Sequence, residues 1–181
     1  MRKTTNGLLL GALSAMLALP SSAQALKVTT LDSKAPLVDV TVMVKAGSSQ
    51  DPEGLEGIAA LTASLVIEGG FGEAASPVTK ELLAEITRPW GSGAYPSVAV
   101  SKETTVFSFT VPREALGRYV DEVMGPLLTK PLFEAKELER LRAESLQGLR
   151  SSLRLERIED LGLVALDNLI HEGTSYAHPD G

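Results

Sequence analysis

The chain has 181 residues, carries 23 acidic against 17 basic side chains, and contains no cysteine. Its formal charge of -6 argues against nucleic acid or an anionic membrane as a partner, because both would repel it. Without cysteine the chain can form no disulfide, thiolate nucleophile, sulfur-ligated metal site or lipid-modified N-terminus.

The first 25 residues have the pattern of a secretory signal peptide. Arg2 and Lys3 precede an apolar run, Leu8–Leu19, and small residues follow, ending at Ala23-Gln24-Ala25. The run is well short of the ~20 residues that a bilayer span needs. We expect cleavage after Ala25 and export, to the periplasm of a Gram-negative-type cell or otherwise into the medium, with no membrane insertion afterwards. Residues 26–181 suffice for one domain.

The first half of this domain starts with strands. From Val38 to Lys45, valines alternate with other residues, which predicts a strand with one buried face. A shorter strand is expected beside it at Leu26–Leu31. A loop from Ala46 to Gly54 then leads to an apolar segment, Gly57–Glu68, which we interpret as a buried helix.

The middle of the chain predicts a helix followed by a hairpin. The helix begins at Pro77 or Val78 and ends near Arg88, with Ser76 or Thr79 at its start. Two strands are expected within Val98–Val111, turning near Ser101-Lys102-Glu103.

Three helices are predicted after the hairpin. Apolar residues recur at helical spacing over Leu116–Leu127, and Pro126 and Pro131 bracket the far end of this helix. The next helix begins near Glu134, and Ile158–Ile170 forms the last. Residues expected inward on the helix after Glu134 are Leu138, Leu141, Ser145 and Leu149; those expected outward, as a solvated charged face, are Glu137, Glu139, Arg140, Arg142 and Glu144. The element order predicts an α+β fold, an antiparallel or mixed sheet covered by helices.

Three short motifs at the start of the domain lie in a distinctive order. A strand, Val38–Val44, is followed by Ala46-Gly47-Ser48 and then by a helix that opens with Gly57-Ile58-Ala59. This order resembles the pitrilysin or insulinase family of zinc metallopeptidases. In that family the helix continues with His-x-x-Glu-His, which supplies two zinc ligands and a catalytic glutamate. The matching positions here are Ala60, Ala63 and Ser64, which offer neither an imidazole nor a carboxylate.

The resemblance continues downstream. Pro131-Leu132-Phe133 and the segment Glu137–Arg142 resemble the family's helix that supplies a third zinc ligand, a glutamate. That ligand aligns with Gly148; a shift of register would bring in Glu144, but one carboxylate cannot hold a catalytic zinc. The tail, His171–Gly181, resembles a histidine-proline-tyrosine-glycine segment late in the family's first domain.

The resemblance implies a pitrilysin-type half-domain at residues 26–181 that is incomplete at its C-terminal end. It also implies the zinc-less type of exported bacterial subunit, with no cofactor of its own and a zinc-bearing paralogous subunit as partner. A peptide is a possible substrate of such a pair. The family's glycine-containing edge for peptide substrates would fall at Gly93, Ala94 and Tyr95, although a simple glycine loop over the core explains these residues equally well.

Other candidate sites are weaker. His171 and His178, the only histidines, lie in a polar segment that is more typical of surface residues than of ligands. Ser64 has no base at helical spacing and is expected to be a small residue facing the core. Two alternative functions stay open: a peptide-binding or assembly module without a peptidase role, and an active zinc peptidase with unorthodox ligands.

Overall fold

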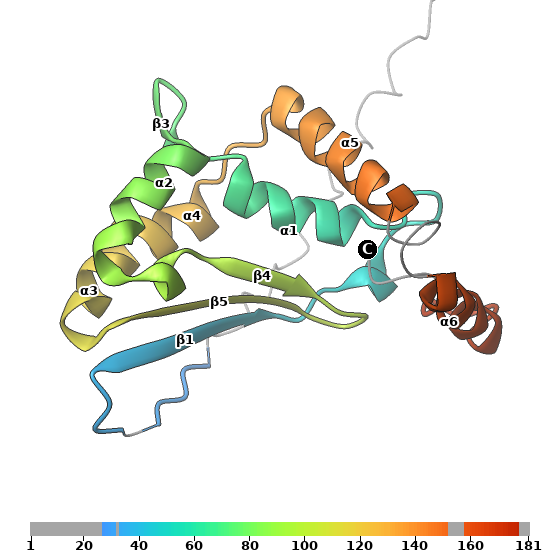
Figure 1. Ribbon diagram of the computed structural model, residues 1–181, viewed down its shortest axis with the longest axis horizontal. Coiled ribbons are helices and arrows are strands. Elements are labelled where there is room, and N and C mark those ends of the chain that lie inside the picture. The colour runs from blue at the N-terminus through green and yellow to red at the C-terminus, as the bar shows by residue number, and fades with distance from the viewer. Residues whose placement is uncertain (1–26, 32, 152–157, 178–181) are drawn as a thin grey trace, which may run out of the picture. The chain divides into compact units, whose positions relative to one another are not determined.

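The computed structural model describes residues 27–31, 33–151 and 158–177 (Figure 1). The chain divides into two compact units, Met1–Lys34 and Ala35–Gly181. The signal peptide expected at residues 1–25 lies outside the described residues. The strand expected at Leu26–Leu31 is not formed at 27–31, where Val28 and Leu31 are largely exposed and so gain no apolar burial to fix an extended segment.

A three-stranded antiparallel sheet is the base of the second unit, with the order β1-β5-β4. Its strands are β1, Leu37–Val44; β4, Ser97–Val100; and β5, Thr105–Pro112. Val40 pairs with Phe109, and Val98 pairs with Phe107. Partly buried residues alternate with exposed ones along β1, and buried residues alternate with partly buried ones along β5, which confirms the predicted strand. The antiparallel pairing of β4 with β5 confirms the predicted hairpin.

Six α-helical segments are described. Their bounds are α1, Ile58–Glu68; α2, Lys80–Thr87; α3, Leu116–Tyr119; α4, Gly125–Thr129; α5, Ala135–Ser151; and α6, Ile158–Ile170. Among these described helices, none is both long enough and apolar enough to cross a bilayer.

The start of α2 differs from the prediction. Residues Ser76–Val78 form a strand, β3, that pairs with β2, Phe71–Glu73. Pairing of Phe71 with Val78 and of Glu73 with Ser76 holds this segment extended, so it cannot form the first turn of the helix. The helix begins only after Thr79, whose hydroxyl accepts a hydrogen bond from the Leu82 amide.

Helical structure runs from Leu116 through Pro126 to Thr129, which confirms the helix predicted at Leu116–Leu127. Val120–Met124, between α3 and α4, forms a π-helical turn in which the Gly125 amide donates to the Val120 carbonyl. A proline within an α-helix clashes with the carbonyl four residues before it. The wider turn accommodates Pro126, and the helix continues to Thr129.

The core lies between the sheet and the helices. Tyr119 is fully buried, stacks on Phe109, and meets the edge of Trp90. The buried cluster consists of Phe71, Leu83, Ala94, Phe109, Val111, Tyr119, Val123 and Leu127.

Helix α1 is a middle layer. It packs on β4 on one side and on α5 on the other, and Figure 1 shows α1 and α5 running in opposite directions. The inward face predicted for α5 is only partly correct. Leu141 is buried, but Ser145 and Leu149 are exposed.

Candidate functional site

The Ala46-Gly47-Ser48 motif fixes the loop before α1 to the turn between β4 and β5. The amides of Ser48 and Ser49 donate to the carbonyls of Ser101 and Lys102, at 3.0 and 2.8 Å. A Cβ atom at Gly47 would lie 2.2 Å from the Ser101 carbonyl oxygen. Only glycine therefore permits this approach of two backbones.

The Gly57-Ile58-Ala59 motif is the capped start of α1. Gly57 has φ of 92°, a left-handed conformation that favours glycine. The Asp51 carboxylate accepts hydrogen bonds from the Gly57 and Ala59 amides, at 2.7 and 3.0 Å. These two contacts satisfy amides that have no partner within the helix, so they set where α1 begins.

The three positions aligned with the zinc motif lie on α1. Ala63 is buried, with 4% of its surface exposed, and Ala60 and Ser64 are partly buried. Their spacing places them on neighbouring parts of one helix face. A methyl group or a lone hydroxyl cannot supply the ligands of a catalytic zinc or an acid–base group for water.

Gly148 lies on an exposed part of α5. Glu68 of α1 contacts Arg140 of α5, and the two helices are antiparallel (Figure 1). Ala60 lies eight residues before Glu68 on α1, and Gly148 lies eight residues after Arg140 on α5. Ala60 and Gly148 therefore lie at about the same level along the antiparallel helix pair. A Cβ atom at Gly148 would meet no atom within 4 Å, which leaves room for a larger side chain.

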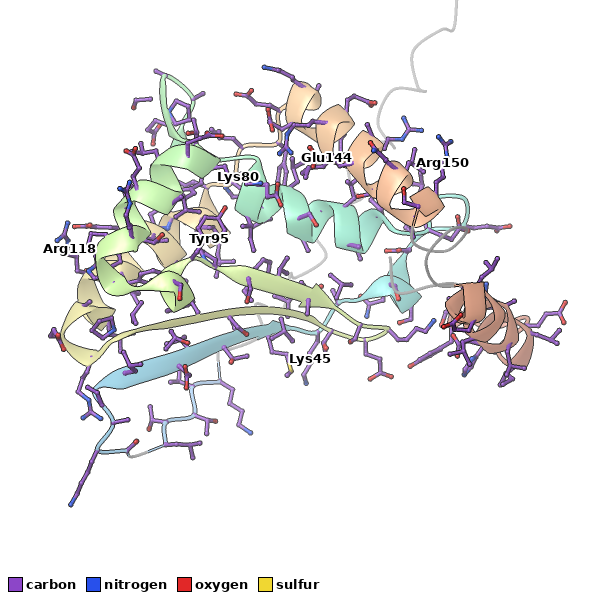
Figure 2. The ribbon with its side chains drawn as sticks, viewed as in Figure 1. Lys45, Lys80, Tyr95, Arg118, Glu144 and Arg150 are labelled. Atoms are coloured by element: carbon purple, nitrogen blue, oxygen red, sulfur yellow. The ribbon has the colours of Figure 1, made fainter. Side chains whose placement is uncertain are left out.

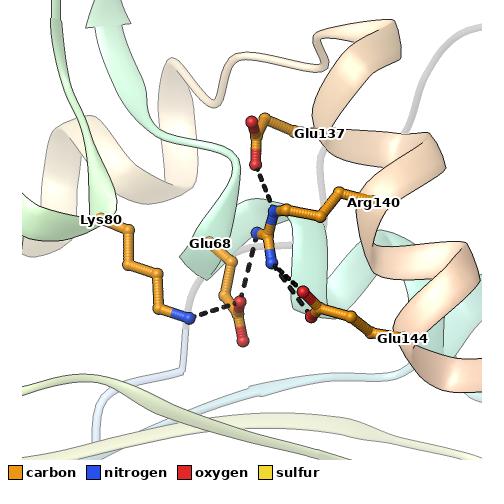
Figure 3. Close-up of polar contacts among 5 residues, drawn as sticks. All are labelled: Glu68, Lys80, Glu137, Arg140 and Glu144. Atoms are coloured by element: carbon orange, nitrogen blue, oxygen red, sulfur yellow. Dashed lines mark hydrogen bonds and ion pairs between the residues drawn. The ribbon is translucent and has the colours of Figure 1, made fainter. Parts of the chain in front are cut away.

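Carboxylates from two helices surround the guanidinium of Arg140 (Figure 3). Its Nε donates to Glu137 at 2.8 Å, its Nη1 donates to both oxygens of Glu144 at 2.9 and 3.0 Å, and its Nη2 donates to Glu68 at 3.4 Å. Lys80 Nζ donates to the same Glu68 oxygen at 2.7 Å. The resulting ion cluster of Glu68, Lys80, Glu137, Arg140 and Glu144 runs from α2 through α1 to α5, and Figure 2 labels its ends, Lys80 and Glu144.

The pKa values in the ion cluster reflect this pairing. Burial raises the pKa of the Glu68 carboxyl, but hydrogen bonds and charges from Lys80 and Arg140 outweigh burial and leave that pKa below its usual value. The hydrogen bond to Glu68 raises the pKa of Lys80. Hydrogen bonds to Glu137 and Glu144 raise the pKa of Arg140. All three groups are therefore charged at neutral pH.

The ion cluster corrects the prediction of a simple solvated face on α5. Glu137 and Arg140 are partly buried and turn toward α1, because Glu68 lies there. The spacing of Glu137, Arg140 and Glu144 was a visible signal for a guanidinium held on its own helix. Glu68 could not be assigned to it, since it lies 72 residues away in the sequence.

The predicted peptide edge is only partly accessible. Gly93 is exposed, Ala94 is fully buried, and Tyr95 is partly buried. The Ala94 carbonyl accepts a hydrogen bond from the Tyr119 hydroxyl at 2.7 Å, which holds this turn on the core. Gly93 and Tyr95 line an open depression of about 430 Å³ that extends over β1, β4 and β5.

His171 follows α6 and contacts its own helix. Its Nδ1 lies 3.0 Å from the Asp167 carbonyl and 3.3 Å from the Asp167 carboxylate, and its ring stacks on Tyr176. His178 lies outside the described residues. Within the part of the chain that is described, no group of three or more histidine, aspartate or glutamate side chains is arranged to hold a metal ion.

Comparison with known proteins identifies the family. The family model of insulinase, peptidase family M16, matches residues 27–158. A search of curated proteins found no match.

Two solved structures have a similar fold. One is described as an inactive domain of peptidase M16 from Pseudomonas fluorescens, with a TM-score of 0.61 and 22% identity, covering 81% of this chain and 34% of that one. The other is the first half of the periplasmic protease PqqL from Escherichia coli, with a TM-score of 0.60 and 16% identity, covering 78% of this chain and 30% of that one. This chain thus spans about a third of each. With the family match over residues 27–158, the chain belongs to the insulinase family of peptidases and has the α+β half-domain fold of that family, in a form whose sequence lacks His-x-x-Glu-His.

Proposed function

We propose that this chain is a non-catalytic member of an exported insulinase-family assembly, and that it assists a zinc-bearing paralogue in degrading peptides or proteins in the periplasm. The observation that carries the proposal is the set of small residues Ala60, Ala63, Ser64 and Gly148, at the aligned ligand and base positions of a chain that belongs to this family.

The chemistry of these positions supports a partner role. A catalytic zinc takes three protein ligands and keeps one position open for water. Ala60 and Gly148 have no ligating atom, Ser64 has only a hydroxyl, and Ala63 cannot act as a base. The nearby carboxylates on α1 and α5 are engaged by Arg140 and Lys80. Zinc chemistry in such an assembly would therefore come from another subunit.

Helix α6 supports association with further polypeptide, because it is tied to the rest of the domain through a polar contact and leaves large apolar side chains exposed. Asp167 forms an ion pair with Lys102 at 3.3 Å, and Lys102 also donates to the Tyr176 carbonyl at 3.0 Å. Four large apolar side chains of α6, Leu163, Leu166, Leu169 and Ile170, form an apolar face and are 64%, 52%, 67% and 68% exposed. An apolar surface of this kind on a water-soluble domain usually marks a contact with another protein surface.

The two solved structures support a larger assembly and a periplasmic location. Both chains are about three times longer than the part that this chain matches, and one of them is described as periplasmic. We assign the apolar face of α6 to contact with the zinc-bearing subunit.

Affinity purification of the tagged chain from the cells that encode it tests the proposal. We expect a family member with an intact His-x-x-Glu-His motif to co-purify, and the chain alone to cleave no peptide. Zinc-dependent cleavage by the chain alone, abolished by phenanthroline, would contradict the proposal. Recovery of partners that all lack the motif would instead favour the assembly-module alternative.

A matched pair of variants tests the surface on α6. Leu163→Lys with Leu166→Lys places two charges on the apolar face and should reduce recovery of the zinc-bearing subunit. Ser175→Lys, at an exposed position after the helix, adds a charge away from that face and should leave recovery unchanged. If both variants recover equal amounts of the zinc-bearing subunit, α6 is not part of the interface.

A further inference from the structure

The ion cluster has one feature that ordinary surface ion pairs lack. Arg140 is only 33% exposed and Glu68 29% exposed, and the guanidinium contacts three carboxylates at once. Partly buried pairs are less screened by salt than exposed ones. The planar fork of arginine can also serve several carboxylates in fixed directions, which a lysine cannot do.

The contacts divide into two kinds. Glu137 and Glu144 lie on the same helix as Arg140, one turn before and one turn after it. They hold the guanidinium from both sides, so little side-chain freedom is lost when it meets a third partner. That partner, Glu68, is the contact that crosses from α5 to α1, and Lys80 holds Glu68 from the side of α2.

Charge balance makes Arg140 the central group. Three carboxylates converge on it, and the only other cation of the ion cluster is Lys80, which contacts Glu68 alone in the cluster. If Arg140 were neutral, three negative charges would share one ammonium group at the α1–α5 contact. Like charges this close repel each other and disfavour the approach of the two helices.

We propose that Arg140 is the fixed cation that joins α5 to α1 in this domain and keeps the two helices in place. The proposal deepens the proposed function, since it names what links the helices that carry Ala60, Ser64 and Gly148. The two proposals can fail separately. Hydrogen exchange measures only the contact between α1 and α5, whereas affinity purification tests the pairing with a zinc-bearing subunit.

Hydrogen exchange of the purified full chain tests this role. Arg140→Gln should speed exchange in the last turn of α1 and the first turns of α5 by about 5- to 30-fold, the change in an opening equilibrium expected for one such interaction. The matched control is Arg142→Gln. Arg142 is 62% exposed and pairs with Glu139 on its own helix at 3.6 Å, so its loss should change exchange by less than about twofold.

A double-mutant cycle distinguishes an ionic link from general damage to α5. Glu68→Gln should speed exchange in the same segments, and the effects of the two single variants should not multiply in the double variant, because both remove the Arg140–Glu68 contact. Equal exchange in Arg140→Gln and Arg142→Gln, or effects that multiply in the double variant, would overturn the proposal. If Arg140→Gln does not fold, Arg140→Lys replaces it, and unchanged exchange in that variant would overturn the proposal equally.

Discussion

Replacing Gly47 by alanine places a methyl group where the loop before α1 meets the turn between β4 and β5. The new Cβ atom would lie 2.2 Å from the Ser101 carbonyl oxygen and 2.7 Å from the carbonyl of Lys102. Both obstacles are backbone atoms, so the turn must move away by roughly 1 Å to reach ordinary contact. A displacement of that size breaks the hydrogen bonds donated by Ser48 and Ser49.

The expected cost follows from those two bonds. At about 0.5–1.5 kcal/mol each, the variant should lose about 1–3 kcal/mol of unfolding free energy. For a domain of this size the loss lowers the melting temperature by about 3–10 °C. Thermal unfolding followed by circular dichroism measures it. Gly148→Ala is the control: it fills open space in α5 and should stabilise by about 0.5–1 kcal/mol. A melting temperature of Gly47→Ala within about 1 °C of the unmodified protein would show that the loop accepts a methyl group at this position.

Two further predictions concern buried and paired groups. Tyr119→Phe removes the hydroxyl that donates to the Ala94 carbonyl. The carbonyl is then buried without a partner, so urea unfolding should show a loss of about 1–3 kcal/mol of unfolding free energy. A loss below about 0.3 kcal/mol would mean that this hydrogen bond contributes nothing to stability. The pKa of Glu68 lies below its ordinary value of 4.5, so its stabilising effect is present above that value and is lost as the pH falls through the folded-state pKa. Unfolding free energies measured between about pH 6 and about pH 3 should therefore fall less in Glu68→Gln than in the unmodified protein, and parallel curves would contradict the assigned pairing.

Periodicity was enough to predict the main elements. The valines of β1, the apolar run of α1, and the β4–β5 hairpin all have patterns that extend over several residues. The short β2–β3 pair was missed because three residues in each strand are too few to show alternation. The π-helical turn at Val120–Met124 was missed because it has no signal in a pattern of period 3.6.

The candidate site could be predicted in part. The sequence predicts that positions 60, 63, 64 and 148 align with the family's zinc site and supply none of its ligands, and this stays a prediction. The ion cluster could not be read in the same way, since Glu68 and Arg140 meet only when α5 packs on α1. Ala94 was a candidate for peptide contact until the fold placed it beneath the surface, where it accepts a hydrogen bond from Tyr119.

Rebuilding the family's zinc ligands on α1 and α5 tests whether Ala60, Ala63, Ser64 and Gly148 occupy the positions of that site. A variant with Ala60→His, Ala63→Glu, Ser64→His and Gly148→Glu should bind one zinc ion per molecule in a calorimetric titration, whereas the unmodified protein should bind none stoichiometrically. Circular dichroism establishes that the variant is folded. A folded variant that binds no zinc would contradict the claim that these four positions are those of the family's zinc site.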